Sequence, residues 1–175
     1  MNTYNSILAQ LMTHKKWVDM SLYEILYTSV YQDRPDLVKK TLYWLNHIHI
    51  VDQIFKSHML GEPSYFSSTE SNSFAPLPEL HKAVETLDQW LIDYAQTLNE
   101  EAANEVVNFI FTDGDNGSMS RMQMLMHLSS HGLYHIGVTT QELANQDLPV
   151  PPLLFTTYLT TMKQQKTPTN METML

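Results

Sequence analysis

Three histidines stand four residues apart in the segment HLSSHGLYHIG: His127, His131 and His135. On a helix, residues at this spacing lie near one face, so the imidazole rings would form a column along it. Such a column could bind a divalent metal ion, or it could consist of buried histidines that hydrogen-bond to their neighbours. A further inward-facing histidine on a second helix would favour the metal site.

The segment NHIH supplies two candidates for that further ligand. His47 lies four residues before Val51, on the face of the expected apolar stripe. His49 is two positions further on, about 200° around a helix, and is predicted to lie on the opposite, solvated side. The helical phase therefore favours His47, His131 and His135 as a group of metal ligands.

The neighbours of these histidines have less certain roles. His127 lies one turn before His131, where it could be a fourth ligand, a group that orients another histidine, or a residue at the rim of the bundle. Asp52 follows His47 by five residues, roughly 140° around the helix, and is expected to be a surface charge or a partner for a neighbouring helix. The sequence therefore indicates no general base, and the catalytic residues are left unassigned.

Three imidazoles from two helices suit a borderline divalent ion. Zinc at such a site keeps an open position for water or substrate. We expect zinc or nickel, with iron or manganese as alternatives, because imidazole ligands do not discriminate sharply among these ions. Two other helical metal motifs do not fit: Gly132 stands where the H-E-x-x-H motif has its glutamate, and the chain lacks the Glu-x-x-His pairs of di-iron bundles.

The elements that must position these residues are helices. Apolar residues recur at helical spacing, and four long helices are predicted, over residues 4–30, 35–60, 78–98 and 121–145. The first helix is expected to bury a stripe that includes Ile7 and to turn Lys15 and Asp19 towards other faces. The short gap after this helix predicts that the first two helices are antiparallel neighbours.

The connections between the helices complete an all-α four-helix bundle. A long loop over residues 62–78, rich in serine and proline, could border a site. The stretch 105–120, with its DGDNG turn, predicts a small β-hairpin before the fourth long helix, and Ser120 is a candidate N-cap for that helix. A short closing helix is expected over 152–165. We expect a single metal-binding domain over residues 1–165 and a flexible tail over 166–175.

Composition excludes several classes of function. The chain has 175 residues, with 10 Lys and Arg against 19 Asp and Glu, and a formal net charge of −9. Such an acidic chain without a basic cluster is not expected to bind nucleic acid. The absence of cysteine excludes thiolate ligands and a cysteine nucleophile. No signal pattern or membrane span is evident, so we expect a soluble cytoplasmic protein without a membrane partner.

Three segments resemble the DinB/YfiT-like family of metal-binding bundles. TLYWLNHIHIVDQIF resembles the second-helix signature of that family, and HLSSHGLYHIG with the following LPVPPLLF resembles its fourth helix and the turn after it. LAQLMTHKKWVDMSLYEIL resembles the opening helix, with Trp-Val-Asp where family members often have Trp-Ala-Asn. The resemblance covers about residues 4 to 160.

The resemblance implies a metal-binding four-helix bundle that is commonly a homodimer. The family's ligands fall on His47, His131 and His135, the same three residues that the helical phase favours, whereas His127 matches a histidine that is usually not a ligand. Many members follow the last ligand with Arg-Gly, but this chain has Ile136-Gly137. Any interaction of that arginine is therefore lost here.

The resemblance also suggests a chemistry. Characterised members include thiol S-transferases and a thiol-dependent isomerase, in which the metal is thought to bind a low-molecular-weight thiol as its thiolate. A bound cation lowers the pKa of a thiol or a water and so produces a nucleophile at neutral pH. We therefore expect a metal-dependent transferase or hydrolase with a small-molecule substrate. The alternative is a non-catalytic metal-binding or stress-response bundle.

Overall fold

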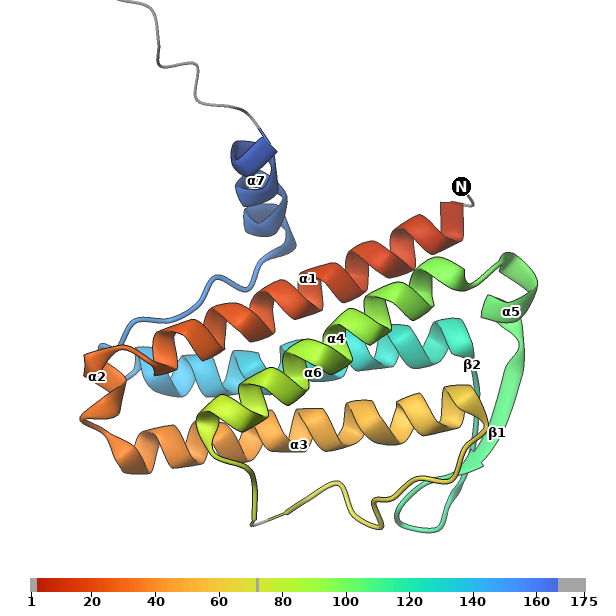
Figure 1. Ribbon diagram of the computed structural model, residues 1–175, viewed down its shortest axis with the longest axis horizontal. Helices are drawn as coiled ribbons and strands as arrows, with labels where there is room; N and C mark the ends of the chain where they lie inside the picture. The colour runs from red at the N-terminus through yellow and green to blue at the C-terminus, as the bar shows by residue number, and fades with distance from the viewer. Residues whose placement is uncertain (1–2, 72, 167–175) are drawn as a thin grey trace, which may run out of the picture.

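Four long helices form most of the computed structural model, which describes residues 3–71 and 73–166 (Figure 1). They are α1 (Thr3–Leu26), α3 (Pro35–Leu60), α4 (Leu77–Thr97) and α6 (Arg121–Ala144). The other elements are the short helices α2 (Ser29–Gln32), α5 (Glu100–Asn104) and α7 (Phe155–Lys166), and the strands β1 (Val106–Ile110) and β2 (Asn116–Ser120). The predicted all-α bundle with one small hairpin is confirmed. None of the helices described here is long and apolar enough to cross a membrane.

Local sequence signals explain where the long helices begin and end. Pro35 occupies the first turn of α3, and Gly61 ends this helix in the left-handed conformation, with φ 69°. Ser120 caps α6 as predicted: its hydroxyl accepts from Gln123 N, and the Gln123 side chain accepts from Ser120 N. The predicted single helix over 4–30 is wrong at its end, because Thr28 adopts an extended conformation and separates α1 from α2.

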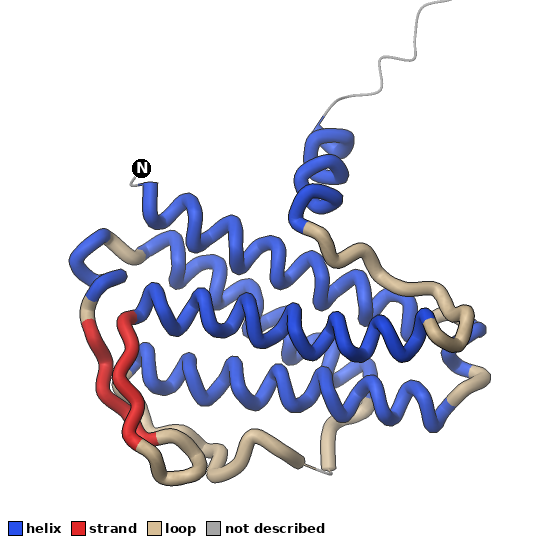
Figure 2. Tube along the Cα trace, turned by 180° about the vertical axis from the view of Figure 1, so that it is seen from behind, coloured by secondary structure: helices blue, strands red, loops and turns tan. Residues whose placement is uncertain are grey.

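One further difference concerns a short helix. Helix α5 was not predicted; Asn99 caps it by accepting a hydrogen bond from Ala102 N. The hairpin forms as expected, with β1 and β2 antiparallel and Phe109 paired with Gly117. Its red strands lie at one end of the bundle in Figure 2. Of the expected tail, Lys166 closes α7, and residues 167–175 lie outside the described residues.

The order of the helices around the bundle differs from the prediction. Helix α1 packs mainly on α4 and α6, and α3 also packs on α6 and α4, so α1 and α3 lie diagonally across the bundle (Figure 1). They are antiparallel, but they are not the expected neighbours. The cause is the long loop between α3 and α4: it returns along the bundle, so that α4 runs parallel to α3 and takes a place between α1 and α3.

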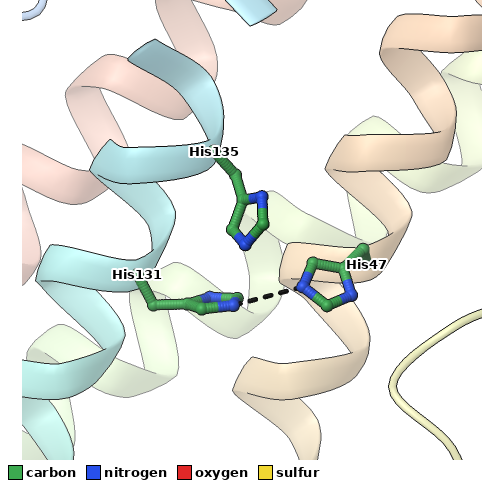
Figure 3. A group of neighbouring side chains, drawn as sticks. All are labelled: His47, His131 and His135. Atoms are coloured by element: carbon green, nitrogen blue, oxygen red, sulfur yellow. Dashed lines mark hydrogen bonds between the residues drawn. The ribbon is translucent and has the colours of Figure 1, made fainter. Parts of the chain in front are cut away.

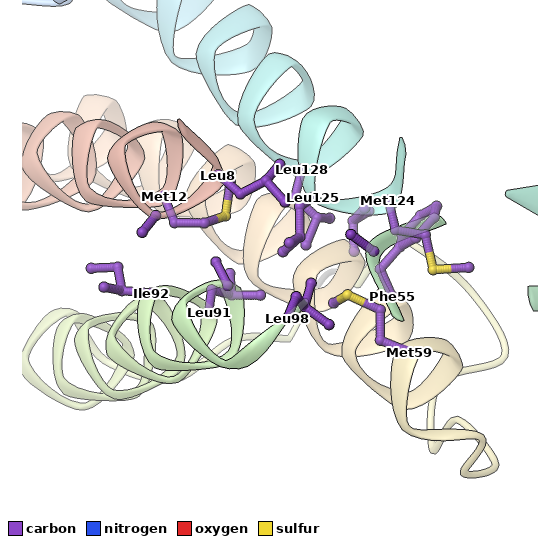
Figure 4. Packing of buried hydrophobic residues seen from close by; sticks show 14 residues of the cluster. Leu8, Met12, Phe55, Met59, Leu91, Ile92, Leu98, Met124, Leu125 and Leu128 are labelled. Carbon is purple, nitrogen blue, oxygen red and sulfur yellow. The ribbon is translucent and has the colours of Figure 1, made fainter. Parts of the chain in front are cut away.

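The apolar core forms two clusters along the bundle. One lies at the hairpin end and includes Phe55, Met59, Leu91 and Leu125 (Figure 4). The other lies towards α2 and includes Tyr31. The core therefore extends along the length of the four helices.

The predicted faces of α1 require correction. Ile7 is 54% exposed, whereas Lys15 and Asp19 are each 1% exposed. A sequence pattern treats charges as surface residues because they are rarely buried without partners. Here Lys15 and Asp19 pair with each other, and Lys15 also pairs with carboxylates from two other helices. The inward face of α1 is therefore partly ionic.

The buried ion cluster consists of Lys15, Asp19, Asp52 and Asp88. Lys15 Nζ lies 2.8 Å from Asp19 on its own helix, 2.7 Å from Asp52 on α3 and 2.7 Å from Asp88 on α4. An ammonium group has three N–H donors, and each finds one carboxylate. The cluster thus ties three of the four long helices together.

Burial and charge act in opposite directions within this cluster. Burial lowers the pKa of Lys15, but the three carboxylates raise that pKa well above its ordinary value. Burial raises the pKa of Asp52 to about 6, although Lys15 acts in the other direction. The pKa of Asp88 is also raised well above its ordinary value, first by burial. Lys15 therefore remains charged.

We predict that Lys15→Met destabilises the protein by roughly 3–5 kcal/mol at pH 7, because breaking a buried ion pair leaves uncompensated buried charge. Urea unfolding measures the change in free energy. Lys16→Met is the matched control: Lys16 pairs with Glu85 at the surface, at 3.7 Å, and such a pair contributes about 1 kcal/mol or less. A Lys15→Met protein as stable as the wild type would contradict this account of the cluster.

Candidate metal centre

Three histidines from two antiparallel helices lie close together, about halfway along the length of the bundle. His47 projects from α3, and His131 and His135 project from successive turns of α6 (Figure 3). One ring nitrogen from each lies within 4.8 Å of the others, and all three residues are half-buried. The three residues that the sequence favoured are therefore brought together.

The spacing of the nitrogens suits a metal ion. His47 Nε2 and His131 Nε2 are 3.2 Å apart. Two imidazole nitrogens bound to a tetrahedral zinc ion at about 2.0–2.1 Å would lie roughly 3.3 Å apart. The rings of His47 and His131 each have their centroid 4.6 Å from that of His135. The residues present therefore fit a divalent ion.

The long loop sets the tautomer of His47. His47 Nδ1 lies 2.9 Å from the carbonyl oxygen of Thr69, to which it must donate a proton. The Nε2 atom of a neutral His47 is then a lone-pair donor aimed at the other two histidines. This is the arrangement in which a carbonyl partner orients a metal-binding histidine. The expectation that the loop borders the site is confirmed at Thr69, a residue that the sequence did not single out.

Trp44 is a second neighbour that the sequence analysis missed. Its ring stacks on His135, with centroids 5.1 Å apart and an interplanar angle of 23°. It also lies edge-on to His47, at 5.9 Å. Trp44 precedes His47 by three residues, so the helical spacing could have indicated this contact. The indole forms an apolar wall beside two of the three histidines.

Burial keeps the histidines of α6 in the neutral, metal-binding form. Burial lowers the pKa of His131 to about 3, and His135, His47 and His127 act in the same direction. The pKa of His135 is lowered by burial and then by His47. Because a metal ion competes with protons for imidazole nitrogen, neutral rings at pH 7 favour metal binding.

Comparison with known proteins agrees with this geometry. The model of the DinB family matches residues 1–164. The chain belongs to the DinB family. No curated protein and no solved structure matches the chain significantly. The family that the histidine segments resemble is thus confirmed, and the match extends over nearly the whole described chain.

His127 stands apart from the other three histidines in this DinB family protein. It is not among the residues whose nitrogens converge. Its ring lies between Phe55, with centroids 4.8 Å apart, and His131, at 5.4 Å. The ring of His127 therefore packs beside His131 without joining the converging nitrogens.

The departure from the family at Ile136 has a structural counterpart. Ile136 is 1% exposed and belongs to the core cluster towards α2. Its side chain is therefore part of the apolar packing of α6. Position 136 supplies no charged group to the histidines in this chain.

Two predictions about α3 need correction. His49 turns away from His47, as expected, but it is half-buried rather than solvated. Asp52 is 1% exposed, so it is not a surface charge. The sequence also allowed Asp52 to be a partner for a neighbouring helix, and the structure supports this role, because Lys15 of α1 binds Asp52.

We predict that His131→Ala abolishes stoichiometric metal in purified, untagged protein, because it leaves only two converging imidazole nitrogens to hold the ion. His47→Ala and His135→Ala should have the same effect. Elemental analysis after dialysis measures the metal. His49→Ala is the matched control on α3 and should leave the metal content unchanged. Full retention of metal in His131→Ala would exclude the site.

Proposed function

We propose that this DinB family protein binds a divalent metal ion through His47, His131 and His135 and uses it as an enzyme. The convergence of three imidazole nitrogens within 4.8 Å carries the proposal. Zinc or nickel is the expected ion, with iron or manganese as alternatives, because the ligands are all imidazoles. The protein is further proposed to be cytoplasmic and to act on a small molecule.

The ligand set leaves room for a substrate. Three protein ligands are typical of catalytic zinc sites, whereas structural sites have four. The chain has no cysteine that could complete the set. When bound, a divalent ion would lower the pKa of a coordinated thiol or water and so supply a nucleophile at neutral pH. A thiol S-transferase or a hydrolase is therefore the proposed class of enzyme.

The residues around the histidines would orient this chemistry. Thr69 O holds the Nδ1–H of His47, which keeps Nε2 directed at the site. Trp44 covers His135 on one side with an apolar ring, and this would exclude water from part of the site. Together, these two groups would keep the ligand nitrogens in place while the open position exchanges its occupant.

The alternative is a non-catalytic metal-binding or stress-response protein with the same three ligands. Metal content cannot separate the two functions, but turnover can. An enzyme of the S-transferase class would join an added thiol to a chloroarene, with a carbon–sulfur bond formed and chloride released. A metal-loaded protein without turnover of thiols or hydrolysable esters would favour the alternative.

We predict that the cobalt-substituted protein changes its visible spectrum when a low-molecular-weight thiol such as N-acetylcysteine is added. The reason is that a thiolate in the open position would become a cobalt ligand. His131→Ala, treated in the same way, is the control and should show no thiol-dependent change. A cobalt spectrum that neither thiols nor small anions alter would indicate a closed site and would contradict the enzyme proposal.

A homodimer is also proposed. Members of the family are commonly homodimers. In addition, the outer face of α6 carries Met126, Tyr134 and Val138, which are 52%, 67% and 51% exposed. They recur at intervals of eight and four residues, within about 120° of one another around the helix, and form a broad apolar stripe that Ser130 interrupts. Such a stripe is typical of a surface that another chain covers.

Light scattering at micromolar concentration should therefore give the mass of two chains. Val138→Glu should shift the protein towards the monomer, because it places a charge in the stripe. Val30→Glu, at a valine of α2 that is 44% exposed, is the matched control and should remain dimeric. A wild-type monomer would refute the dimer without bearing on the metal.

A further inference from the structure

A cavity of about 650 Å³ lies between α3, α4 and the long loop. His49 and Lys56 line it from α3, Lys82 and Trp90 from α4, and Tyr65 and Phe66 from the loop. Its volume falls within the range of about 300–1,000 Å³ that is typical of small-molecule sites. None of the three converging histidines is among its lining residues, so it is separate from the metal centre.

The walls of the cavity are mainly aromatic and aliphatic. Trp90 and Phe66 are partly buried, whereas Tyr65 is 96% exposed and still borders the cavity. A nearly fully exposed tyrosine contributes little to the packing of the loop, but its ring offers a flat apolar surface to a ligand. Aromatic side chains on several sides favour a ligand with a planar ring.

Two ammonium groups stand at this cavity without a carboxylate partner. Within the part of the chain that the structure describes, neither Lys56 nor Lys82 forms an ion pair. Lys56 Nζ instead lies 4.5 Å from the centroid of the Trp90 ring. A ligand that contacts the indole would therefore bring an anionic group within reach of Lys56.

The charge of the whole lining limits how many negative charges the ligand can carry. Glu62 and Glu79 also border the cavity and balance the two lysines. A polyanion such as a nucleotide would be repelled by these carboxylates, in a protein whose formal net charge is already −9. A single anionic group placed beside Lys56 and Lys82 satisfies the lysines without this repulsion.

His49 adds a polar group to the same cavity. Its Nδ1 atom is buried and has no hydrogen-bond partner among the described residues. Buried polar atoms are nearly always hydrogen-bonded in folded proteins. His49 therefore brings an unsatisfied polar atom to the wall of the cavity.

We propose that this cavity binds a small aromatic monoanion, an aryl carboxylate in particular, with its ring against Tyr65, Phe66 and Trp90 and its carboxylate beside Lys56 and Lys82. The proposal does not depend on the metal or on the proposed enzyme activity. It assigns the two sides of α3 to different tasks: His47 faces the metal centre, and His49, two residues later, faces the cavity.

Calorimetric titration with 1-naphthoate, and with the uncharged 1-naphthamide as its matched control ligand, tests the proposal. Naphthoate should bind more tightly than the amide. Lys56→Gln and Lys82→Gln should each weaken naphthoate roughly tenfold, as expected for loss of a charge-assisted contact, and leave the amide unchanged. Tyr65→Ser should weaken both ligands, because it removes an exposed apolar wall. Lys39→Gln, an exposed lysine of α3 away from this cavity, should change neither.

For the two lysine variants, the comparison of the two ligands distinguishes a local effect from misfolding, because a misfolded variant would lose both. Binding should also be the same in wild-type protein and in His131→Ala, so a failure of the metal proposal would not affect it. Absence of saturable naphthoate binding up to millimolar concentration would overturn the proposal. Equal loss in Lys39→Gln and Lys56→Gln, or loss in His131→Ala, would also overturn it.

Discussion

The ammonium group of Lys15 is the interaction on which the arrangement of the helices depends. It binds carboxylates from α1, α3 and α4 at 2.7–2.8 Å. Its aliphatic stem also lies against α6, because a Cβ atom added at Gly132 would be 3.4 Å from Lys15 Cε. One side chain therefore contacts all four long helices. Apolar side chains tolerate sliding, but three directed ion pairs hold the helices in one register.

This register brings the histidines together. Gly132 lies between His131 and His135 on α6, and Asp52 follows His47 on α3 by little more than one turn. Fixing Lys15 against Gly132 and Asp52 thus fixes the two helix segments that carry the three imidazoles. The cluster contributes no metal ligand, yet it sets how closely His47 approaches His131. The buried ion cluster and the three histidines are therefore positioned by the same register of the helices.

Helical phase predicted that His131 and His135 share a face of α6 and that His47 lies on the apolar face of α3, but it left the role of His127 open. The ends of α3 and α6 were also predictable, from Pro35, Gly61 and Ser120. Burial of Lys15 was not, because Asp52 and Asp88 lie on two other helices and only the i,i+4 partner Asp19 is visible in the local pattern. The same limit applies to Thr69, whose role arises from its backbone carbonyl and from the path of the loop. Contacts between segments that are far apart in the sequence determine these two features, and local spacing does not reveal them.

The long loop contacts both the histidine cluster and the cavity, which lie on different sides of α3. Its Thr69 carbonyl binds His47, while its Tyr65 and Phe66 side chains border the cavity beside His49. Loops of this kind tolerate changes in length and composition at small cost to stability. Changes in this one segment would therefore alter the surroundings of His47 and of His49 together, without touching the packing of the four helices. The bundle would act as a fixed frame, and the loop as its adjustable part.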